Sequence, residues 1–198
     1  IPASVFRVTP GGEKHPLISG LMNPTALVFG PDGRLYISSR YDGAVYVADT
    51  DGNYELFSRG LGEACGLAFD SKGNLFVGDR TGSVFRVNRE GESAFFADLP
   101  PSPIGYHLAC DSRDTLYVTV PLEIGENTIY TISPEGTVAE FLTDLSEFHG
   151  ILVDAEDRLL VAEICQGKGG IIRINPQTRE KTRLLSGEDL ISLALTPD

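Results

Sequence analysis

Hydrophobic positions recur along this chain in four similar units. In each unit a run of apolar residues follows a short turn rich in Gly and Asp, and the leucines that begin these runs are spaced by 40, 41 and 43 residues. These leucines are Leu35, Leu75, Leu116 and Leu159. A period near 40 residues, with several short strands in each unit, is typical of a β-propeller. The pattern therefore predicts an all-β fold built from repeated blades.

Each unit contains four segments that predict strands. The first, or inner, segment is continuously apolar, which suits a strand buried on both faces. The fourth is shorter and more polar, which suits an outer strand. The inner segments span residues 26–29, 66–69, 107–110 and 150–153, and the second ones 35–37, 75–77, 116–118 and 159–161. The third segments span residues 45–47, 84–87, 129–132 and 171–174, and the fourth 54–57, 93–96, 138–141 and 181–184.

These segments predict a β-propeller of four-stranded antiparallel blades. Residues 4–8 repeat the third-strand pattern, with residues 16–19 as a fourth strand, and residues 192–195 repeat the inner-strand pattern. We therefore expect a single propeller domain or segment over residues 1–198, with partial blades at each end. The complete blades are expected near residues 22–61, 62–100, 101–145 and 146–189, and the partial ones at residues 4–21 and 190–198.

Two arrangements remain open for the partial blades. Strands from the two ends can share one blade, which removes exposed strand edges and gives a closed five-bladed propeller. Alternatively, the chain is a segment of a larger, six-bladed propeller. Residues 196–198 begin a further turn with no strand after it, so the pattern favours the segment.

The turns between inner and second segments are rich in Gly and Asp. The first reads Gly-Pro-Asp-Gly at residues 30–33, and the others lie at residues 70–73, 111–114 and 154–157. Gly, Asn and Asp readily adopt the positive φ that tight hairpins require. Clustered Asp residues can suggest calcium, but their regular placement at hairpin tips predicts a mechanical role in the turns.

Charge and composition narrow the class of partner. The formal net charge is −12 and the pI is about 4.6, so the surface repels phosphate backbones and anionic lipids. Nucleic acid is not an expected partner, and no apolar stretch approaches the roughly 18 residues that a membrane helix needs. Cys65, Cys110 and Cys165 are too few and too scattered for a disulfide framework or a zinc motif, which predicts buried free thiols. We expect a soluble protein, with export to the periplasm or the cell exterior left open.

Antiparallel strands place two sets of loops on one face of a propeller, around the mouth of its central channel. These are the loops that precede the inner strands and the loops between second and third strands. The channel mouth is the usual place for convergent polar groups. The candidates there are Asn23, Arg40, Glu63, Asp79, Arg80, Tyr106, His107, Glu123, Glu126, Asn127, Glu147, His149 and Glu163.

His107 and His149 stand at equivalent places, at the beginning of successive inner strands. Side chains at such places would lie on neighbouring blades and face one cavity. Histidine acts as a general base near neutral pH or binds a metal through a neutral nitrogen. We therefore predict a catalytic role for both. The alternative is a pair of buried, hydrogen-bonded histidines that cap their strands.

Other polar side chains on this face suggest contacts with ligands. Glu63, Asp79 and Glu163 are predicted to supply oxygen ligands to a hard cation such as calcium. An ion pair between Asp79 and Arg80 is the alternative. No Ser-His-Asp order, Gly-rich phosphate loop or zinc spacing stands out. The predicted substrate contacts are Asn23, Arg40, Tyr106 and Arg80.

The repeat itself resembles a known group of propellers. Residues 26–37 (ALVFGPDGRLYI) and residues 66–77 resemble the repeat of the SGL superfamily, which includes gluconolactonase and regucalcin, the senescence marker protein. LRE-like and NHL-repeat propellers are similar as well. Residues 150–157 are similar to a segment of gluconolactonases. The resemblance implies a six-bladed propeller.

The resemblance also implies a function. Six-bladed members of the family bind one divalent cation, usually calcium, at the channel mouth and hydrolyse sugar lactones. Where the family has Pro-Asp-Gly before an inner strand, this sequence has Phe148-His149-Gly150. One expected function is therefore metal-assisted hydrolysis of a sugar lactone or a similar small ester, with calcium as the candidate cofactor. The other is a non-catalytic, NHL-like propeller that binds a protein or carbohydrate partner.

Overall fold

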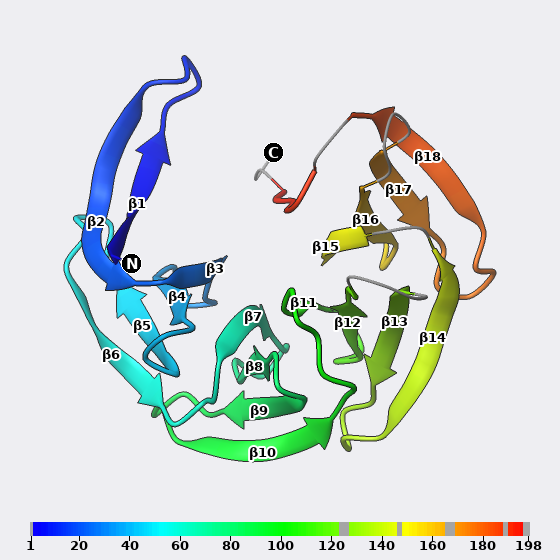
Figure 1. The fold of residues 1–198 in the computed structure, drawn as a ribbon, viewed down its shortest axis with the longest axis horizontal. Helices are drawn as coiled ribbons and strands as arrows, with labels where there is room; N and C mark the ends of the chain where they lie inside the picture. The colour runs from blue at the N-terminus through cyan, green and yellow to red at the C-terminus, as the bar shows by residue number, and fades with distance from the viewer. Residues whose placement is uncertain (1, 123–126, 146–147, 165–168, 188–189, 196–198) are drawn as a thin grey trace.

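Four sheets of four antiparallel strands and one sheet of two strands make up the computed structural model, which describes residues 2–122, 127–145, 148–164, 169–187 and 190–195. The four larger sheets follow one another around a central axis as the blades of a partial propeller (Figure 1). The predicted all-β propeller with four complete blades is confirmed. None of the described chain forms a helix long and apolar enough to cross a membrane.

The strands of each blade follow one another from the inside of the ring to the outside (Figure 1). Blade one contains β3 (Pro24–Phe29), β4 (Leu35–Ser39), β5 (Ala44–Ala48) and β6 (Tyr54–Arg59). Blade two contains β7 (Ala64–Phe69), β8 (Leu75–Asp79), β9 (Ser83–Val87) and β10 (Ser93–Asp98). Blade three contains β11 (His107–Cys110), β12 (Leu116–Val120), β13 (Asn127–Ile132) and β14 (Val138–Leu145). Blade four contains β15 (Phe148–Val153), β16 (Leu159–Glu163), β17 (Gly170–Ile174) and β18 (Lys181–Ser186).

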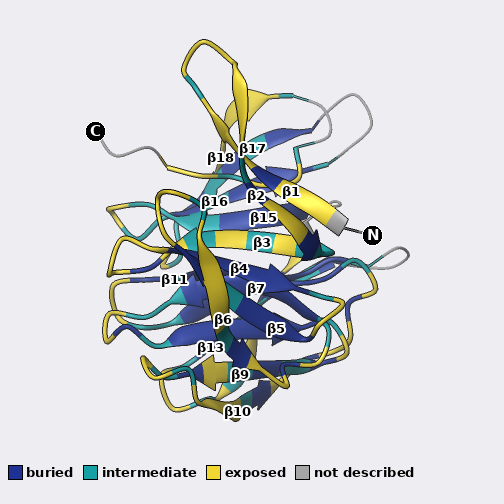
Figure 2. Ribbon diagram, turned by 90° about the vertical axis from the view of Figure 1, so that its left-hand side faces the viewer, coloured by how far each residue is buried: buried dark blue, intermediate teal, exposed yellow. Residues whose placement is uncertain are grey.

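Burial is greatest in the second strands and least in the outermost strands, and the low burial of the outermost strands agrees with their polar sequences. Strands β8 and β12 are buried at every residue, whereas β18 is exposed at every residue. Figure 2 shows exposed residues on the outer strand β6 and also on the inner strand β3. The second strands are buried because neighbouring blades cover both of their faces.

The core is divided into layers between adjacent blades. Tyr36 and Val45 of blade one pack with Leu67 and Leu75 of blade two. Corresponding clusters join blade two to blade three and blade three to blade four. Burying one side chain of this size stabilises the fold by about 1.5–3 kcal/mol. Each blade therefore depends on its neighbours for its core.

One inner strand differs from the prediction of burial on both faces. Strand β7 fits that prediction, since every residue but Phe69 is buried. Strand β3 alternates instead, and its Leu27 and Phe29 are 54% and 70% exposed. Figure 1 shows β3 beside the opening of the ring, between β1 and residues 190–195. In the described chain no blade covers β3 on that side, so the prediction is wrong for this strand.

The Gly- and Asp-rich hairpins have the mechanical role that their spacing predicts. In blade two, a carboxylate oxygen of Asp70 accepts the main-chain N–H groups of Lys72 and Asn74, at 3.0 and 2.8 Å. Such bonds close the turn on the side chain of its first residue. Positive φ angles of 76°, 81°, 63° and 58° occur at Gly33, Gly73, Asp114 and Asp157.

Two of these hairpins also connect neighbouring blades. The main-chain N–H and the hydroxyl of Ser71 in blade two donate to the carboxylate of Asp114 in blade three, at 2.8 and 3.0 Å. Ser112 and Asp157 make the same bonds between blades three and four, at 2.9 and 2.5 Å. Hydrogen bonds from the serines hold the pKa of both carboxyl groups below its usual range. These acidic residues therefore hold blades together.

The first two strands and residues 190–195 lie at the opening of the ring (Figure 1). Strands β1 (Pro2–Val8) and β2 (Lys14–Met22) form the two-stranded sheet and contain the predicted third and fourth strands. Residues 190–195 lie beside β15, because a Cβ on Gly150 would be 2.8 Å from both the carbonyl oxygen of Ile191 and the Cα of Ser192. They form no strand, so the strand predicted at residues 192–195 is wrong. Residues 196–198 lie outside the described residues.

Candidate functional site

The inner strands begin where the second strands end, and this places one set of loops around the channel mouth. Antiparallel pairing carries these loops to the same end of every blade. The predicted arrangement of the loops is therefore confirmed for the described residues. The strand register pairs Pro24 with Ser39, Ala64 with Asp79, His107 with Thr119, and Phe148 with Glu163.

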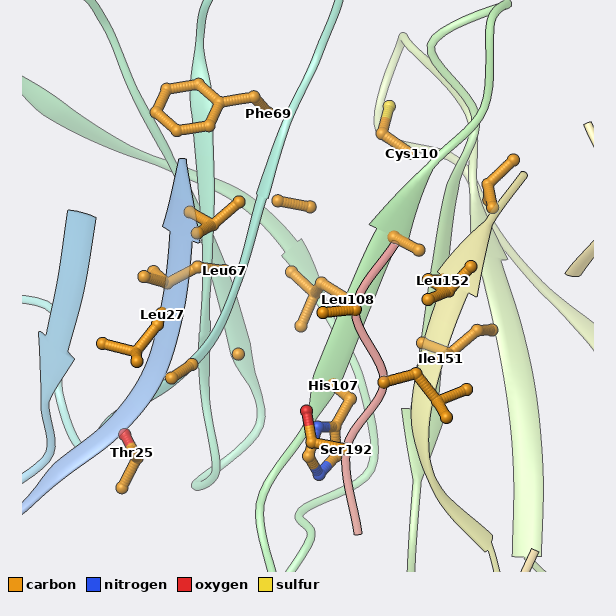
Figure 3. A pocket seen from close by; sticks show the side chains of 18 of the residues that line it. Thr25, Leu27, Leu67, Phe69, His107, Leu108, Cys110, Ile151, Leu152 and Ser192 are labelled. Carbon is orange, nitrogen blue, oxygen red and sulfur yellow. The ribbon is translucent and has the colours of Figure 1, made fainter. Parts of the chain in front are cut away.

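Inner strands from all four blades, together with residues 191–194, line a cavity of 690 Å³. Oxygen- and nitrogen-bearing side chains lie toward one end, where Figure 3 shows Thr25, His107 and Ser192. The cavity therefore combines an apolar body with a polar end. The aliphatic side chains of its wall include Leu27, Leu67, Leu108, Ile151, Leu152 and Leu193.

At the polar end, His107 meets a histidine of the next blade, His149, and we call these two residues the histidine pair. His107 begins β11 and lines the cavity, and His149 lies in β15 with 8% of its surface exposed. Their ring centroids are 6.1 Å apart and the ring planes meet at 67°. Burial, with the neighbouring His149 ring, lowers the pKa of His107 to about 4. At neutral pH the His107 ring is therefore uncharged, with one nitrogen that can accept a proton.

The histidines of the pair do not occupy equivalent positions, which corrects the prediction. Leu108 of β11 and Ile151 of β15 face matching valines of the second strands. His107 stands directly before Leu108, whereas one further residue separates His149 from Ile151. A register shift between Phe148 and Ile151 absorbs that residue as a β-bulge. The two histidines that meet are therefore non-equivalent residues of their blades, and blades one and two have the same register shift as blade four.

The corresponding residue of blade two shows where the His107 position points. There the residue is Gly66, and a Cβ on it would lie 2.5 Å from the carbonyl oxygen of Tyr106, at the start of the next blade. A side chain at this position is thus directed at the next inner strand. For His107 the next inner strand is β15, and the ring meets His149.

A second polar group lies between the loops of blades one and two. We call it the arginine–carboxylate cluster, and it contains Arg40, Glu63, Asp79 and Arg80. One carboxylate oxygen of Glu63 is 2.5 Å from Nε of Arg80 and 3.5 Å from Nε of Arg40. Asp79 is 5% exposed and accepts the N–H of Glu63 at 2.9 Å and the N–H and hydroxyl of Thr81 at 3.0 and 2.6 Å. Both carboxylates are therefore bound by donors of the protein itself.

Two predicted substrate contacts, Tyr106 and Asn23, make bonds within the protein. Tyr106 is 2% exposed and its hydroxyl donates to the carbonyl oxygen of Pro100 at 2.6 Å, which places it in the core and not on the cavity wall. Asn23 adopts a φ of 51° between β2 and β3, and its carbonyl oxygen accepts the N–H of Arg40 at 3.1 Å. Its side chain stays a predicted contact. The side chains of Arg40 and Arg80 are 32% and 29% exposed, so they stay predicted contacts.

The three predicted metal ligands do not lie together. Glu63 and Asp79 belong to the arginine–carboxylate cluster, whereas Glu163 lies in blade four, where it pairs with Arg183. Among the residues that the structure describes, no three His, Cys, Asp or Glu side chains are grouped so that they could hold a metal ion. These three carboxylates therefore do not fit one shared site, and calcium stays a prediction. The candidates Glu123, Glu126 and Glu147 lie outside the described residues, as does Cys165.

The two described cysteines are free thiols. Cys65 is buried as predicted, whereas Cys110 is only partly buried. Burial raises the pKa of both thiols, so neither is a thiolate nucleophile at neutral pH.

Sequence reasoning missed Thr119 and Ser192. Thr119 is fully buried in β12 and donates its hydroxyl to the carbonyl oxygen of His149 at 2.7 Å. Ser192 lines the same cavity as His107. The available signal for Thr119 was a polar residue within an otherwise apolar strand segment, but its partner lies in another blade.

Comparison with known structures supports the propeller fold. Neither a family model nor a curated protein matches the sequence. Virginiamycin B lyase from Staphylococcus aureus is similar, with a TM-score of 0.68 and 18% identity over 91% of this chain and 62% of that chain. A gluconolactonase from Xanthomonas campestris gives a TM-score of 0.64 and 13% identity over 85% and 63% of the two chains. Nidogen, solved in a complex with laminin, gives a TM-score of 0.77 and 17% identity over 91% of this chain and 72% of that chain.

These similarities establish a six-bladed type of propeller fold and no more, because the identities are only 13% to 18%. The expected likeness to gluconolactonases is confirmed at the level of the fold. This chain spans 62% of the length of the S. aureus lyase. A catalytically inactive variant of that lyase, in which alanine replaces a histidine, has been solved with quinupristin.

Proposed function

We propose that this propeller cleaves a lactone or a similar small ester at its channel mouth, with His107 and His149 carrying the proton transfers. The observation that carries the proposal is the approach of two histidine rings from neighbouring blades, 6.1 Å between centroids, of which the His107 ring lines the polar end of the 690 Å³ cavity. A cavity with few convergent polar groups and a titratable residue of perturbed pKa is a default candidate for an active site.

Hydrolysis of a lactone needs a base and an acid at the same carbonyl group. The neutral ring of one histidine accepts a proton from water as the water oxygen bonds to the carbonyl carbon. The ester C–O bond then breaks, and the leaving oxygen takes a proton from the second histidine, which receives in exchange the proton that the first histidine gained. Both rings are then neutral again. The product is the open hydroxy acid. His107 can take the role of base because its low pKa leaves the ring unprotonated at neutral pH, although a base of this pKa is weak.

The cavity wall favours an ester with an apolar part over a sugar. Aliphatic side chains such as Leu67, Leu108 and Leu152 line its body and offer no hydrogen bonds to sugar hydroxyl groups. Burying one unpaired hydroxyl group costs roughly 1–3 kcal/mol. The polar end of the cavity suits the carbonyl group of the ester (Figure 3). We therefore expect a lactone or ester that carries an alkyl or aryl group, in place of the sugar lactone implied by the resemblance.

A lyase reaction is the second candidate at the same site. The structural neighbour from S. aureus is a lyase, and its catalytically inactive variant lacks one histidine. An elimination also begins with a base, but the base takes the proton from a carbon atom and no water is added. The mass of the product separates the two reactions, because hydrolysis adds one water and elimination adds none.

A cation and a protein partner are further alternatives. The family resemblance favours calcium, yet arginine side chains and main-chain donors already bind the carboxylates predicted as ligands. Nidogen has a similar fold and occurs in a complex with laminin. A non-catalytic propeller would bind such a partner and turn over no ester.

Three histidine variants test the proposal on alkyl lactones, aryl esters and a sugar lactone. They are His107→Ala, His149→Ala and, as the matched control, His15→Ala on β2, where the histidine side chain is 59% exposed. Loss of an acid–base residue is expected to lower kcat/KM about 10²–10⁴-fold, whereas the control keeps the wild-type value. A chelator followed by added calcium tests the cation in the same assay.

Full activity of His149→Ala on every substrate would contradict the proposed site. No turnover of any ester by folded wild-type protein would favour the binding function. A sugar lactone that is turned over faster than every alkyl or aryl substrate would contradict the expected apolar substrate.

A further inference from the structure

A single buried hydroxyl group connects the two blades that carry the histidine pair. Thr119 lies in β12 and is 0% exposed. Its Oγ1 donates to the carbonyl oxygen of His149 at 2.7 Å and lies 3.4 Å from the carbonyl oxygen of His107. One hydroxyl proton makes only one strong hydrogen bond. The principal bond is therefore the shorter one, which crosses from blade three to blade four.

This bond supplies a constraint that the strand ladder does not. The ladder of blade three holds His107 directly opposite Thr119. In blade four the β-bulge interrupts the ladder around His149 and Gly150, so pairing with β16 holds this part of the main chain less tightly. Strand pairing therefore fixes Thr119 relative to His107, and the hydrogen bond of its hydroxyl group fixes the main chain of His149 relative to Thr119.

Corresponding positions in the other blades show how specific this arrangement is. In blade one the corresponding residue is Ser38, whose Oγ donates to the carbonyl oxygen of Cys65 in blade two at 2.6 Å. In blade two there is no room, because a Cβ on the glycine would lie 2.8 Å from the ring of Tyr106. In blade four the alanine has no hydroxyl. The corresponding residues are Ser38, Gly78 and Ala162.

We propose that Thr119 is a positioning residue that sets the spacing of the His107 and His149 rings. Its consequence for catalysis rests on the proposed function, since ring spacing affects a rate only if the pair transfers protons. Without the hydroxyl, the main-chain oxygen of His149 loses a buried donor, and the bulge is free to shift. A displacement of about 1 Å in an active site can lower a rate about 10²-fold.

Three variants separate this role from general stability. Thr119→Val removes the hydroxyl and keeps the branched shape, Thr119→Ser keeps the hydroxyl, and Ser38→Ala removes the matched bond in blade one. The readouts are kcat and KM on the best ester, and the nuclear Overhauser effect between the ring protons of the histidine pair. The valine variant is expected to lose about tenfold to a hundredfold in kcat, with KM within about twofold, and to weaken the ring-to-ring signal.

The serine variant is expected to restore both readouts, and Ser38→Ala to leave both unchanged. Wild-type kcat and ring-to-ring signal in Thr119→Val would overturn the proposal. Equal losses in Thr119→Val and Ser38→Ala would also overturn it, because the hydroxyl would then act through stability alone. If folded wild-type protein turns over no ester, the proposed function fails, but the nuclear Overhauser comparison still decides whether Thr119 positions the pair.

Discussion

The arginine–carboxylate cluster and the histidine pair lie at the same end of the inner strands but use their polar groups differently. In the cluster, two arginines surround Glu63, and main-chain and hydroxyl donors bind Asp79. In the pair, an uncharged His107 ring faces a second histidine and the cavity. The charged side chains of the cluster thus bind other groups of the protein and hold the loops in place. We expect catalysis from the uncharged histidine ring instead.

Burial explains this difference. A carboxylate that leaves water needs donors in its place, because an unpaired buried charge is very costly. Asp79 accordingly accepts three hydrogen bonds from the protein. Imidazole can lose its proton instead, and burial lowers the pKa of His107 to about 4. The carboxylate of Asp79 is then bound by donors of the protein, whereas the His107 ring keeps an acceptor nitrogen beside the cavity.

The largest effect that separates the two regions is expected from Asp79→Ala. This variant leaves two N–H groups and one hydroxyl without their acceptor, so the free energy of unfolding should fall by about 3 kcal/mol. Urea unfolding measures the loss, and kcat/KM per folded molecule should stay at the wild-type value. Asp51→Ala, in an exposed turn, is the control and should change stability by less than about 0.5 kcal/mol. If Asp79→Ala lost activity with an unchanged free energy of unfolding, Asp79 would belong to the active site.

The histidine pair predicts a pH dependence of stability of similar size. The pKa of His107 is about 4 in the folded protein against an ordinary value of 6.5, so between these pH values the unfolded chain binds more protons. Stability should be complete above pH 6.5 and should fall by about 3 kcal/mol as the pH drops toward 4. Urea unfolding at about pH 5 and pH 7 measures this slope.

Matched variants assign that slope to one ring. His107→Gln should flatten it, and His15→Gln, on the exposed strand β2, should keep it. The cross-blade carboxylates of Asp114 and Asp157 do not confuse the measurement. Their pKa values lie below 3.8, so they lose their contribution at lower pH. An unchanged slope in His107→Gln would show that this ring is not the group that titrates.

The smallest effect is expected at the exposed edge of the arginine–carboxylate cluster. Arg40 lies 3.5 Å from Glu63 with a side chain 32% exposed, and such ion pairs contribute about 0–1 kcal/mol. Arg40→Gln should therefore change the free energy of unfolding by less than about 1 kcal/mol, like Arg59→Gln on the outer strand β6. A raised KM in Arg40→Gln alone would make this arginine a substrate contact and would blur the division between the two regions.

The scaffold was predictable because its signals are local. Apolar strand runs and Gly- or Asp-rich hairpin tips depend on neighbouring residues, and the φ angles of Gly73 and Asp114 confirm the turns. The burial of β3 was not predictable in this way. Its Leu27 and Phe29 are as apolar as their counterparts in β7, but they are exposed at the opening of the ring. Their burial depends on which blade lies beside them.

The candidate site could be predicted in its place but not in its contacts. Loop position alone identified His107, His149, Glu63 and Asp79 as residues of the channel mouth. It could not show that the carboxylates are bound by arginines and main-chain donors, since those bonds join different loops. It also gave no sign of Thr119, whose partner lies 30 residues away in the next blade.

By itself, the sequence determined that this protein is a β-propeller with four complete blades and that the polar residues of its candidate site lie in loops on one face. Only the tertiary structure decided which of those polar residues contact one another. The reason is that apolar strand runs and Gly- or Asp-rich turns are local features, which a sequence displays directly. The sequence did not display that blades one, two and four share a register shift at the start of their inner strands and that the β11–β12 ladder of blade three has none.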